Sequence, residues 1–377
     1  MNEKETAELR RRFHSQKNNI VSIKGCLVNE KGETVTAFSQ PLASFTEDET
    51  EAVLSLFRKT LSGGMGKNLI DLEFPNAQVL NGQEHKRLLR LRDSALRDEE
   101  ALKEVIEAIK TQVRMEGSYL ILFATESYDV FTYGEDGKKS EESTHVFSYF
   151  ICSVCPIKLT KPLLSFAAFD HTCKNLAANS VVSSPVLGFL FPAFDDRTAN
   201  LYGTLLYTKD TYADHSALTG ALFGVKPPLP ASVQQEAFGS VFRESLAEDC
   251  TFDMMEGVRE TVGAIIAEHK ERKEPETLRL SKSEIASVLR ENDADPDRIA
   301  AFEQRYDRTF GSAAKICPAN IIESKKLELS SADVSIKINP DRGDLVETRV
   351  IGGVKYILIR AEEGVELNGI PIEIRES

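Results

Sequence analysis

The sequence predicts an α/β (α+β) fold in three parts: an N-terminal mixed sheet with helices, a helical middle unit and a small C-terminal β meander. Its 377 residues exceed what one compact core usually holds. Strand-like and helical patterns alternate in the first part, helical patterns fill the second, and the last alternates apolar and polar residues. We therefore expect an N-terminal α+β domain over 1–225, a helical domain over 226–315 and a C-terminal β segment over 316–377.

The first elements follow from local patterns near the start of the chain. Residues 3–13 are charged and helical in pattern, and 20–28 and 34–38 read as two strands of a hairpin. Thr46 precedes acidic residues and apolar residues at helical spacing, which predicts a capped helix. The glycines at 63–64 should end that helix.

The remainder of the first domain combines a helical region with further strands. Residues 83–115 have a helical pattern that breaks near Asp98. A turn at 134–137 should join two paired strands, because it is rich in glycine and acidic residues. The strands that continue the sheet are expected at 118–130, 144–154, 186–194 and 200–208, with a helix at 215–223.

A proline-rich segment at 226–230 marks the expected domain boundary, because proline lacks the N–H and restrains the residue before it. Helical patterns follow at 231–246 and 252–270, and Ser281 with Glu284 forms a capping-box pattern for another helix. Apolar and polar residues then alternate in three short strands, expected at 334–338, 345–351 and 354–360.

Charge and composition bear on partners and location. Acidic residues outnumber basic ones by 59 to 46, giving a net charge of −13, so the overall field repels nucleic acid and anionic lipid. No apolar run reaches the roughly 18 residues that a membrane helix needs, and the start is charged. We expect a cytoplasmic protein with no membrane partner, no cofactor and six reduced cysteines.

The segment at 61–67, LSGGMGK, has the composition of a phosphate-binding loop. Such a loop requires a strand before it and a helix after it, so that helix N–H groups face the phosphate. Here a predicted helix precedes the segment and a strand-like stretch at 69–74 follows, with Asn68 where Ser or Thr would hold magnesium. We expect a helix C-terminus and a loop.

Cys152 and Cys155 have the spacing of a redox pair or half a zinc site, and His171 and Cys173 could supply two more ligands. In an extended strand, however, residues three apart point to opposite faces. We expect buried strand cysteines and no metal, with a metal site and a redox pair as the alternatives.

Asp293, Asp295 and Asp297 imitate the first ligands of a calcium loop. The pattern then fails, since Arg298 stands where glycine is needed and Gln304 where the bidentate Glu should be. The segment fits better as the N-cap and first residue of a helix.

One basic helix face stands out. Lys86, Arg87, Arg90 and Arg97 project within roughly a quarter-turn of one another on a helical wheel, with Asp93 among them. The face is either a solvated helix surface or a weak candidate for nucleic-acid binding.

Asp195, Asp196 and Arg197 end an aromatic run that predicts a strand. Two adjacent carboxylates beside a guanidinium could bind a metal or a basic ligand, and strand ends often carry site residues. Alternatively, Asp195 caps a turn and Arg197 pairs with Asp196. These three residues are the catalytic candidates.

Several segments resemble an uncharacterised bacterial family, the domain of unknown function numbered 4317, over nearly the full chain. The resemblance implies no activity and no site residues. A fainter similarity, in the order of elements alone, is to the bacterial nucleoid-associated protein family. The segments that resemble the first family are 9–13 (LRRRF), 59–74 (KTLSGGMGKNLIDLEF), 146–162 (VFSYFICSVCPIKLTKP), 188–197 (GFLFPAFDDR) and 344–361 (DLVETRVIGGVKYILIRA).

These observations leave three hypotheses for the function. The first is a non-enzymatic binding protein associated with the nucleoid, whose partner is DNA or a DNA-associated protein. The second is a metal-assisted hydrolase that uses the Asp-Asp-Arg segment. The third is an oligomeric scaffold, for instance a homodimer, whose β meander or helical unit supplies the interface.

Overall fold

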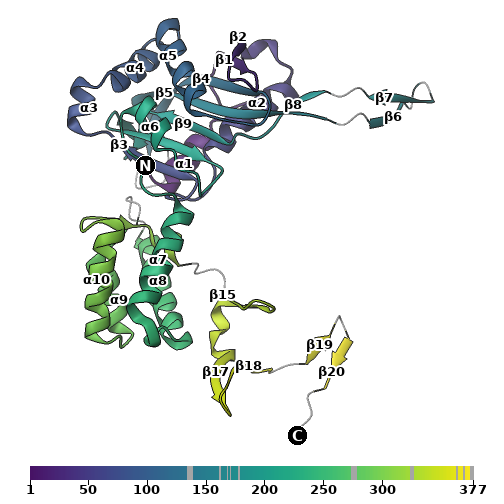
Figure 1. Cartoon of the computed structure of the whole chain (residues 1–377). Coiled ribbons are helices and arrows are strands. Elements are labelled where there is room, and N and C mark those ends of the chain that lie inside the picture. Colours follow the sequence, from purple (N-terminus) through teal and green to yellow (C-terminus); the bar gives the residue numbers. More distant parts are fainter. Residues whose placement is uncertain are drawn as a thin grey trace. The chain divides into compact units, whose positions relative to one another are not determined.

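The computed structural model describes residues 1–133, 139–160, 163–167, 169, 171–176, 179–272, 278–322, 327–361, 364–367 and 370–373. The chain divides into two compact units, one holding Met1–Val233 and one beginning at Gln234 (Figure 1). Among the described residues, no helix is both long and apolar enough to cross a membrane. The predicted division into three domains stays a prediction.

An eight-stranded sheet forms the centre of the first unit. Its main path runs β2-β1-β4-β5-β9-β12-β3, with β8 paired to β5 off this path. Each neighbouring pair is antiparallel. The sheet is therefore antiparallel throughout its described strands, whereas a mixed sheet was expected. The strands are β1 (Ser22–Val28), β2 (Thr34–Pro41), β3 (Leu69–Glu73), β4 (Tyr119–Tyr133), β5 (Lys139–Leu159), β8 (Ser180–Val182), β9 (Leu187–Phe191) and β12 (Gly203–Thr208).

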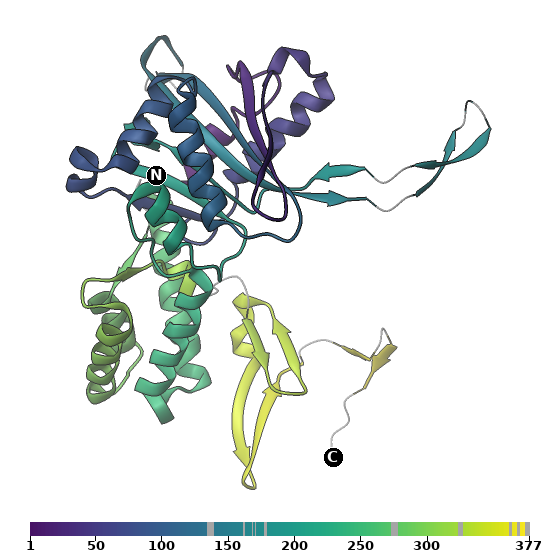
Figure 2. The same ribbon diagram turned by 45° about the horizontal axis from the view of Figure 1, so that its top comes forward.

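Helices cover both faces of the sheet (Figures 1 and 2). Because side chains alternate along a strand, Ile121 and Phe123 pack into the core shared with α4, α5 and α6, whereas Leu122 and Ala124 pack into the core shared with α1 and α2. The sequence therefore supplies two apolar layers from continuous apolar strands. The helices are α1 (Glu3–Arg10), α2 (Glu47–Thr60), α4 (Gln83–Asp93), α5 (Glu99–Gln112) and α6 (Ser216–Phe223).

Predicted helix boundaries are confirmed where capping chemistry sets them. Thr46 and Glu49 form a capping box at the start of α2, and Asp98 accepts a hydrogen bond from the Ala101 N–H at the start of α5. The loop at 61–67 follows α2 and precedes β3, in the order that excludes a phosphate-binding loop. The predicted turn at 134–137 lies outside the described residues.

The first unit also contains a short helix and two small hairpins. The helix α3 (Asn76–Asn81) precedes α4, the 3₁₀ turn η1 spans Leu42–Ser44, and β6 (Leu163–Ala167) pairs with β7 (Thr172–Leu176). The second hairpin, β10 (Ala193–Asp195) with β11 (Thr198–Asn200), carries the predicted acidic segment in its turn.

Helices dominate the start of the second unit. Their core includes Phe242, Leu289, Phe302 and Tyr306, all buried. Ser281 forms the predicted capping box at α9, and Asp295 with Pro296 begins α10, which confirms that the Asp293–Asp297 segment starts a helix. The elements are α7 (Ala231–Leu246), η2 (Ala247–Asp249), α8 (Phe252–Arg272), β13 (Leu280–Ser281), α9 (Lys282–Glu291), α10 (Pro296–Phe310), β14 (Lys315–Ile316) and α11 (Pro318–Ile321).

Among its described residues, the C-terminal region forms three separate two-stranded hairpins instead of the expected continuous meander. The 3₁₀ turn η3 (Pro340–Leu345) lies between the first hairpin and the second, and the strands of these two hairpins do not pair with each other. The hairpins are β15 (Leu327–Ser330) with β16 (Ser335–Ile338), β17 (Val346–Ile351) with β18 (Val354–Ile359), and β19 (Val365–Leu367) with β20 (Ile370–Ile372).

Candidate functional site

The acidic segment lies in the tight turn between β10 and β11. Asp195 is opposite Thr198 in the pairing, so Asp196 and Arg197 form a two-residue loop. Both have positive φ, 48° and 55°, which two-residue hairpin loops require and which residues other than glycine adopt at a cost. The adjacent side chains therefore diverge from this turn.

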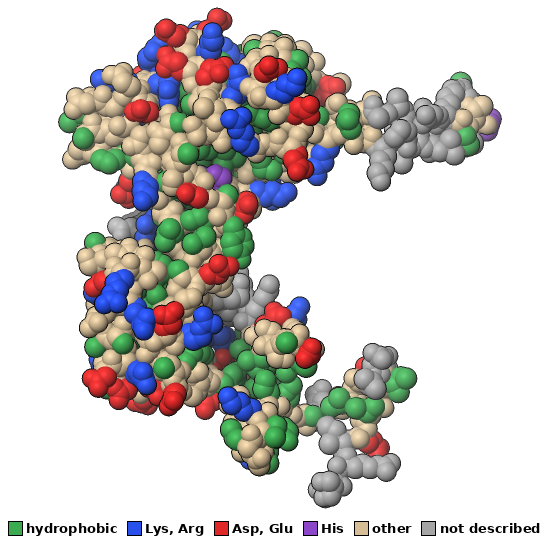
Figure 3. All heavy atoms as spheres, in the orientation of Figure 1, with side chains coloured by type: hydrophobic (Ala, Val, Ile, Leu, Met, Phe, Trp, Pro, Cys, Tyr) green, Lys and Arg blue, Asp and Glu red, His purple; other side chains and the backbone are tan. Residues whose placement is uncertain are grey.

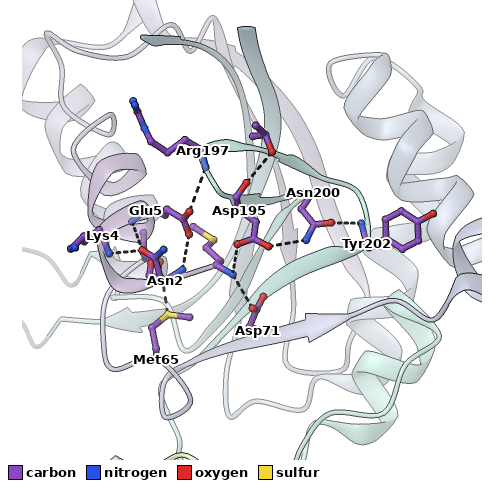
Figure 4. Close-up of polar contacts among 12 residues, drawn as sticks. Asn2, Lys4, Glu5, Met65, Asp71, Asp195, Arg197, Asn200 and Tyr202 are labelled. Carbon is purple, nitrogen blue, oxygen red and sulfur yellow. Dashed lines mark hydrogen bonds and ion pairs between the residues drawn. The ribbon is translucent and has the colours of Figure 1, made fainter. Parts of the chain in front are cut away.

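Asp195 is held by polar groups of the chain itself (Figure 4). Its Oδ1 lies 3.4 Å from the Met1 ammonium, and its Oδ2 accepts a hydrogen bond from Asn200 Nδ2 at 3.1 Å. The same ammonium donates to Asp71 Oδ2 at 3.0 Å. Burial lowers the pKa of this ammonium, but Asp71 and Asp195 outweigh it and the net pKa is raised. Asp195 is thus one of two carboxylates that share a buried cation.

Arg197 binds a different partner. Its Nη2 and Nε donate to the two carboxylate oxygens of Glu8 at 2.8 and 3.2 Å, and its Nη1 donates to the Phe131 carbonyl at 2.8 Å. Tyr128 donates to the same Glu8 at 2.6 Å, and burial together with this carboxylate raises the pKa of Tyr128 to about 12. Asp196 is exposed. Within the described ranges, no group of three or more His, Cys, Asp or Glu side chains could hold a metal.

A second polar network surrounds Glu126, which is 3% exposed. Arg12 donates to its Oε1 from Nη2 at 2.6 Å and from Nε at 3.0 Å, and the Asn19 N–H donates to the same oxygen at 3.1 Å. Tyr149 donates to Oε2 at 2.5 Å, and burial raises the pKa of this tyrosine well above its usual value. The buried charge is therefore paired and hydrogen-bonded, as burial of a carboxylate requires. Sequence analysis did not identify this network.

Two members of the basic face, half-buried Arg87 and exposed Arg90, already make contacts within the first unit. Arg87 Nη2 donates to the Ala221 carbonyl near the end of α6 at 2.8 Å. Arg90 makes a bidentate pair with Asp98 at 2.9 and 3.1 Å and also binds Glu100 at 3.1 Å. Both guanidinium groups therefore make intramolecular contacts.

The other two basic residues of this face are exposed. Lys86 lies on α4, and Arg97 follows it and donates from Nε to the Ser94 carbonyl at 3.1 Å. Acidic and basic side chains alternate on the visible face of the first unit (Figure 3). A nucleic-acid role for the four residues stays a prediction.

Cys152 and Cys155 are buried on opposite faces of β5, as the strand geometry predicts. Cys152 belongs to the core beneath α4, α5 and α6, and Cys155 to the core beneath α1 and α2. Burial raises the pKa of Cys155 to about 12 and raises the pKa of Cys152 well above its usual value. Cys173 is exposed on a separate hairpin.

A cavity of about 570 Å³ lies between the β1–β2 hairpin and α5, and we call it the β1–α5 cavity. Lys24 is opposite Ser39, and Cys26 is opposite Ala37, so these four side chains share one face of the hairpin. Cys26 belongs to the core beneath α5, which shows that this face points toward the helix. β4 contributes Phe123 to the lining.

The helix side of the cavity is a single stripe of α5. Its lining residues recur at spacings of three and four, the period of one helix face. Leu102 and Ile106 are the apolar members, while the charged members alternate in sign. The complete stripe is Glu99, Leu102, Lys103, Ile106, Glu107 and Lys110.

The cavity has free positive charge. Lys110 Nζ donates to Glu107 Oε1 at 2.7 Å, so this pair is locally neutral. Lys24 and Lys103 have no carboxylate partner among the residues that the structure describes. Burial raises the pKa of the Cys26 thiol, so this cysteine is a neutral lining group at physiological pH. The stripe on α5 is a signal in the sequence that could have located the helix side of the cavity.

Comparison with known protein families identifies the family of the chain. The family model described as "Domain of unknown function (DUF4317)" matches residues 1–370. No curated protein and no solved structure matches the chain, so the fainter resemblance to nucleoid-associated proteins gains no support. Because the family model covers nearly the whole sequence, the chain belongs to the DUF4317 family.

Proposed function

We propose that the protein is a non-enzymatic binding protein that holds a small organic anion with an apolar body in the β1–α5 cavity. The observation that carries the proposal is the combination of an apolar lining with two unpaired lysines in one concave site. Its volume of about 570 Å³ lies within the roughly 300–1,000 Å³ of small-molecule sites, which are mostly apolar with a few placed polar groups.

The lining specifies the chemistry of the ligand. Leu102, Ile106 and Phe123 offer apolar surface to a hydrocarbon chain or ring. Lys24 and Lys103 offer ammonium groups that can donate to a carboxylate or sulfonate. Lys24 is half-buried and Lys103 is exposed at the rim, so both ammonium groups remain charged and can pair with the anionic group of a ligand. A neutral Cys26 thiol supports binding without covalent chemistry.

The alternatives draw less support from the geometry. A metal-assisted hydrolase would need Asp195 and Asp196 to converge, whereas Asp195 pairs with an ammonium and Asp196 is exposed. A DNA partner would depend on Lys86 and Arg97, because Arg87 and Arg90, the other two residues of the basic face, already bind carboxylates or carbonyls.

Fluorescence titration with 1-anilinonaphthalene-8-sulfonate, an anion with an aromatic body, tests the proposal, with decanoate as competitor. We expect saturable binding that decanoate displaces. Lys24→Gln combined with Lys103→Gln should weaken it by roughly tenfold or more, the loss of about two charge-assisted contacts. Ala37→Trp, which fills the cavity from β2, should abolish it.

Lys86→Gln is the matched control, since it removes one lysine from an exposed helix outside the cavity. It should leave the titration unchanged. Duplex DNA in a salt series is the competing probe, and log affinity that falls with log salt would support the nucleic-acid hypothesis instead. Probe binding that is equal in all variants would contradict the proposal.

A further inference from the structure

The β17–β18 hairpin is a two-stranded sheet with apolar side chains exposed on both of its faces. Val350, Ile357 and Ile359 are 68%, 47% and 51% exposed, and the register places them on one face. Ile351 and Tyr356 are exposed on the opposite face. In Figure 3, hydrophobic side chains gather on this part of the chain. Two strands alone are marginally stable in water, so this hairpin calls for a partner.

The base of the hairpin is fixed, but its edge is free. Arg259 on α8 donates to the Pro340 carbonyl at 2.8 Å, and the Arg360 N–H donates to the Leu345 carbonyl at 2.8 Å. The first contact ties the segment before β17 to α8, and the second extends the β17–β18 ladder by one residue at its open end. Among the described strands β17 pairs with β18 alone, so one edge of β17 presents unpaired N–H and C=O groups.

We infer that β17 pairs antiparallel with β17 of a second copy of this chain, with the twofold axis at Thr348. The sequence of the strand is complementary to itself in this register. Val346 lies opposite the second copy's Val350, and Glu347 lies opposite its Arg349. Symmetry repeats each contact, because a twofold interface uses the same patch on both chains. Within one chain Arg349 pairs with Glu347, so the dimer exchanges that contact for two Glu–Arg contacts between the chains and adds two Val–Val contacts.

The charges also exclude the neighbouring registers. Along a strand, every second residue points its N–H and C=O groups toward the same edge. Two copies that pair through this edge must therefore match residues of the same set, which places the twofold axis on a residue and moves it by whole residues between registers. An axis at Glu347 places two glutamates opposite each other, and an axis at Arg349 places two arginines opposite each other. Like charges directly opposite are destabilising. Only the axis at Thr348 combines opposite charges with apolar pairs.

The resulting four-stranded sheet joins the exposed apolar residues into larger surfaces. On one face, the exposed Ile359 and the buried Val346 of one chain continue into the exposed Val350 of the other, since residues opposite one another share a face. Ile357 and its symmetry mate flank the central pair of Thr348 residues. Four strands with a continuous apolar face meet the requirement that two strands do not.

Charge reversal on the full chain tests this inference by sedimentation velocity over a concentration series. Glu347→Arg places arginines opposite each other twice, and Arg349→Glu does the same with glutamates. Each single variant should dimerise at least roughly tenfold more weakly than the parent. The double variant, which exchanges both charges, should dimerise like the parent because complementarity returns.

Mixing the two single variants gives the sharpest outcome. One chain then carries two arginines and the other two glutamates, so heterodimers should form where neither variant forms homodimers. Glu268→Arg, at an exposed ion pair on α8, is the matched control and should leave the masses unchanged. A parent that stays monomeric, a dimer that ignores both reversals, or a mixture that fails to associate would each overturn the inference.

Discussion

The buried Glu126 network gives the most quantitative prediction for stability. Arg12→Met removes two hydrogen bonds, of 2.6 and 3.0 Å, from a carboxylate whose side chain is 1% exposed. Hydrogen bonds to charged groups contribute about 1.5–3 kcal/mol each, and breaking a buried pair costs about 3–5 kcal/mol. Tyr149 and the Asn19 N–H still donate to the carboxylate. We therefore expect a loss of about 3 kcal/mol in the free energy of unfolding.

A double-mutant cycle separates the pair from its surroundings. Glu126→Gln keeps an acceptor for Tyr149, so it should cost about 1–2 kcal/mol, and the double variant with Arg12→Met should lose less than the sum of the two. Urea unfolding followed by circular dichroism measures all four proteins. Arg90→Ala, at an exposed pair, should change stability much less. A cycle that is additive within about 0.5 kcal/mol would refute the coupling.

Three further predictions follow from packing and burial. Gly188→Ala should lower the free energy of unfolding by about 1–3 kcal/mol, because the new Cβ would lie 2.4 Å from the backbone oxygen of Cys152. Gly220→Ala, which adds a methyl group in open space on α6, should raise it by about 0.4–1 kcal/mol in the same urea assay. Burial lowers the pKa of His215, so the unfolded chain binds more protons than the folded one, and the free energy of unfolding should fall as pH drops below about 6.5. His215→Gln should reduce this dependence of stability on pH. A dependence that is the same in the variant would show that the imidazole is hydrated in the folded protein. Mass-spectrometric thiol labelling of the native protein should modify exposed Cys173 and spare Cys155, and equal labelling would contradict the strand assignment.

Local chemistry predicted most element boundaries. Thr46, Asp98, Ser281 and Asp295 each cap a helix that the sequence predicted, because a side-chain acceptor beside free N–H groups acts within a few residues. Strand locations were similarly clear from apolar runs. Strand pairing was not, since β3 joins the far edge of the sheet beside β12, more than a hundred residues later in the chain.

The candidate sites likewise combine residues that a local pattern identifies with partners that only the tertiary fold supplies. Asp195 and Arg197 are adjacent enough to suggest joint chemistry, but the fold provides Met1 and Glu8 as their partners from the other end of the unit. The β1–α5 cavity likewise combines Lys24 with Lys103, which are distant in sequence. Tertiary packing creates such sites, and no local pattern encodes them.

Hydrogen–deuterium exchange with and without decanoate tests the central proposal most directly, because it reports where on the chain a ligand binds. If the β1–α5 cavity is the binding site, decanoate should slow exchange in β1, β2 and α5 and leave the helices of the second unit unaffected. The Ala37→Trp variant should show no protection. Exchange that is unchanged by decanoate, or slowed only outside these three elements, would contradict the proposal.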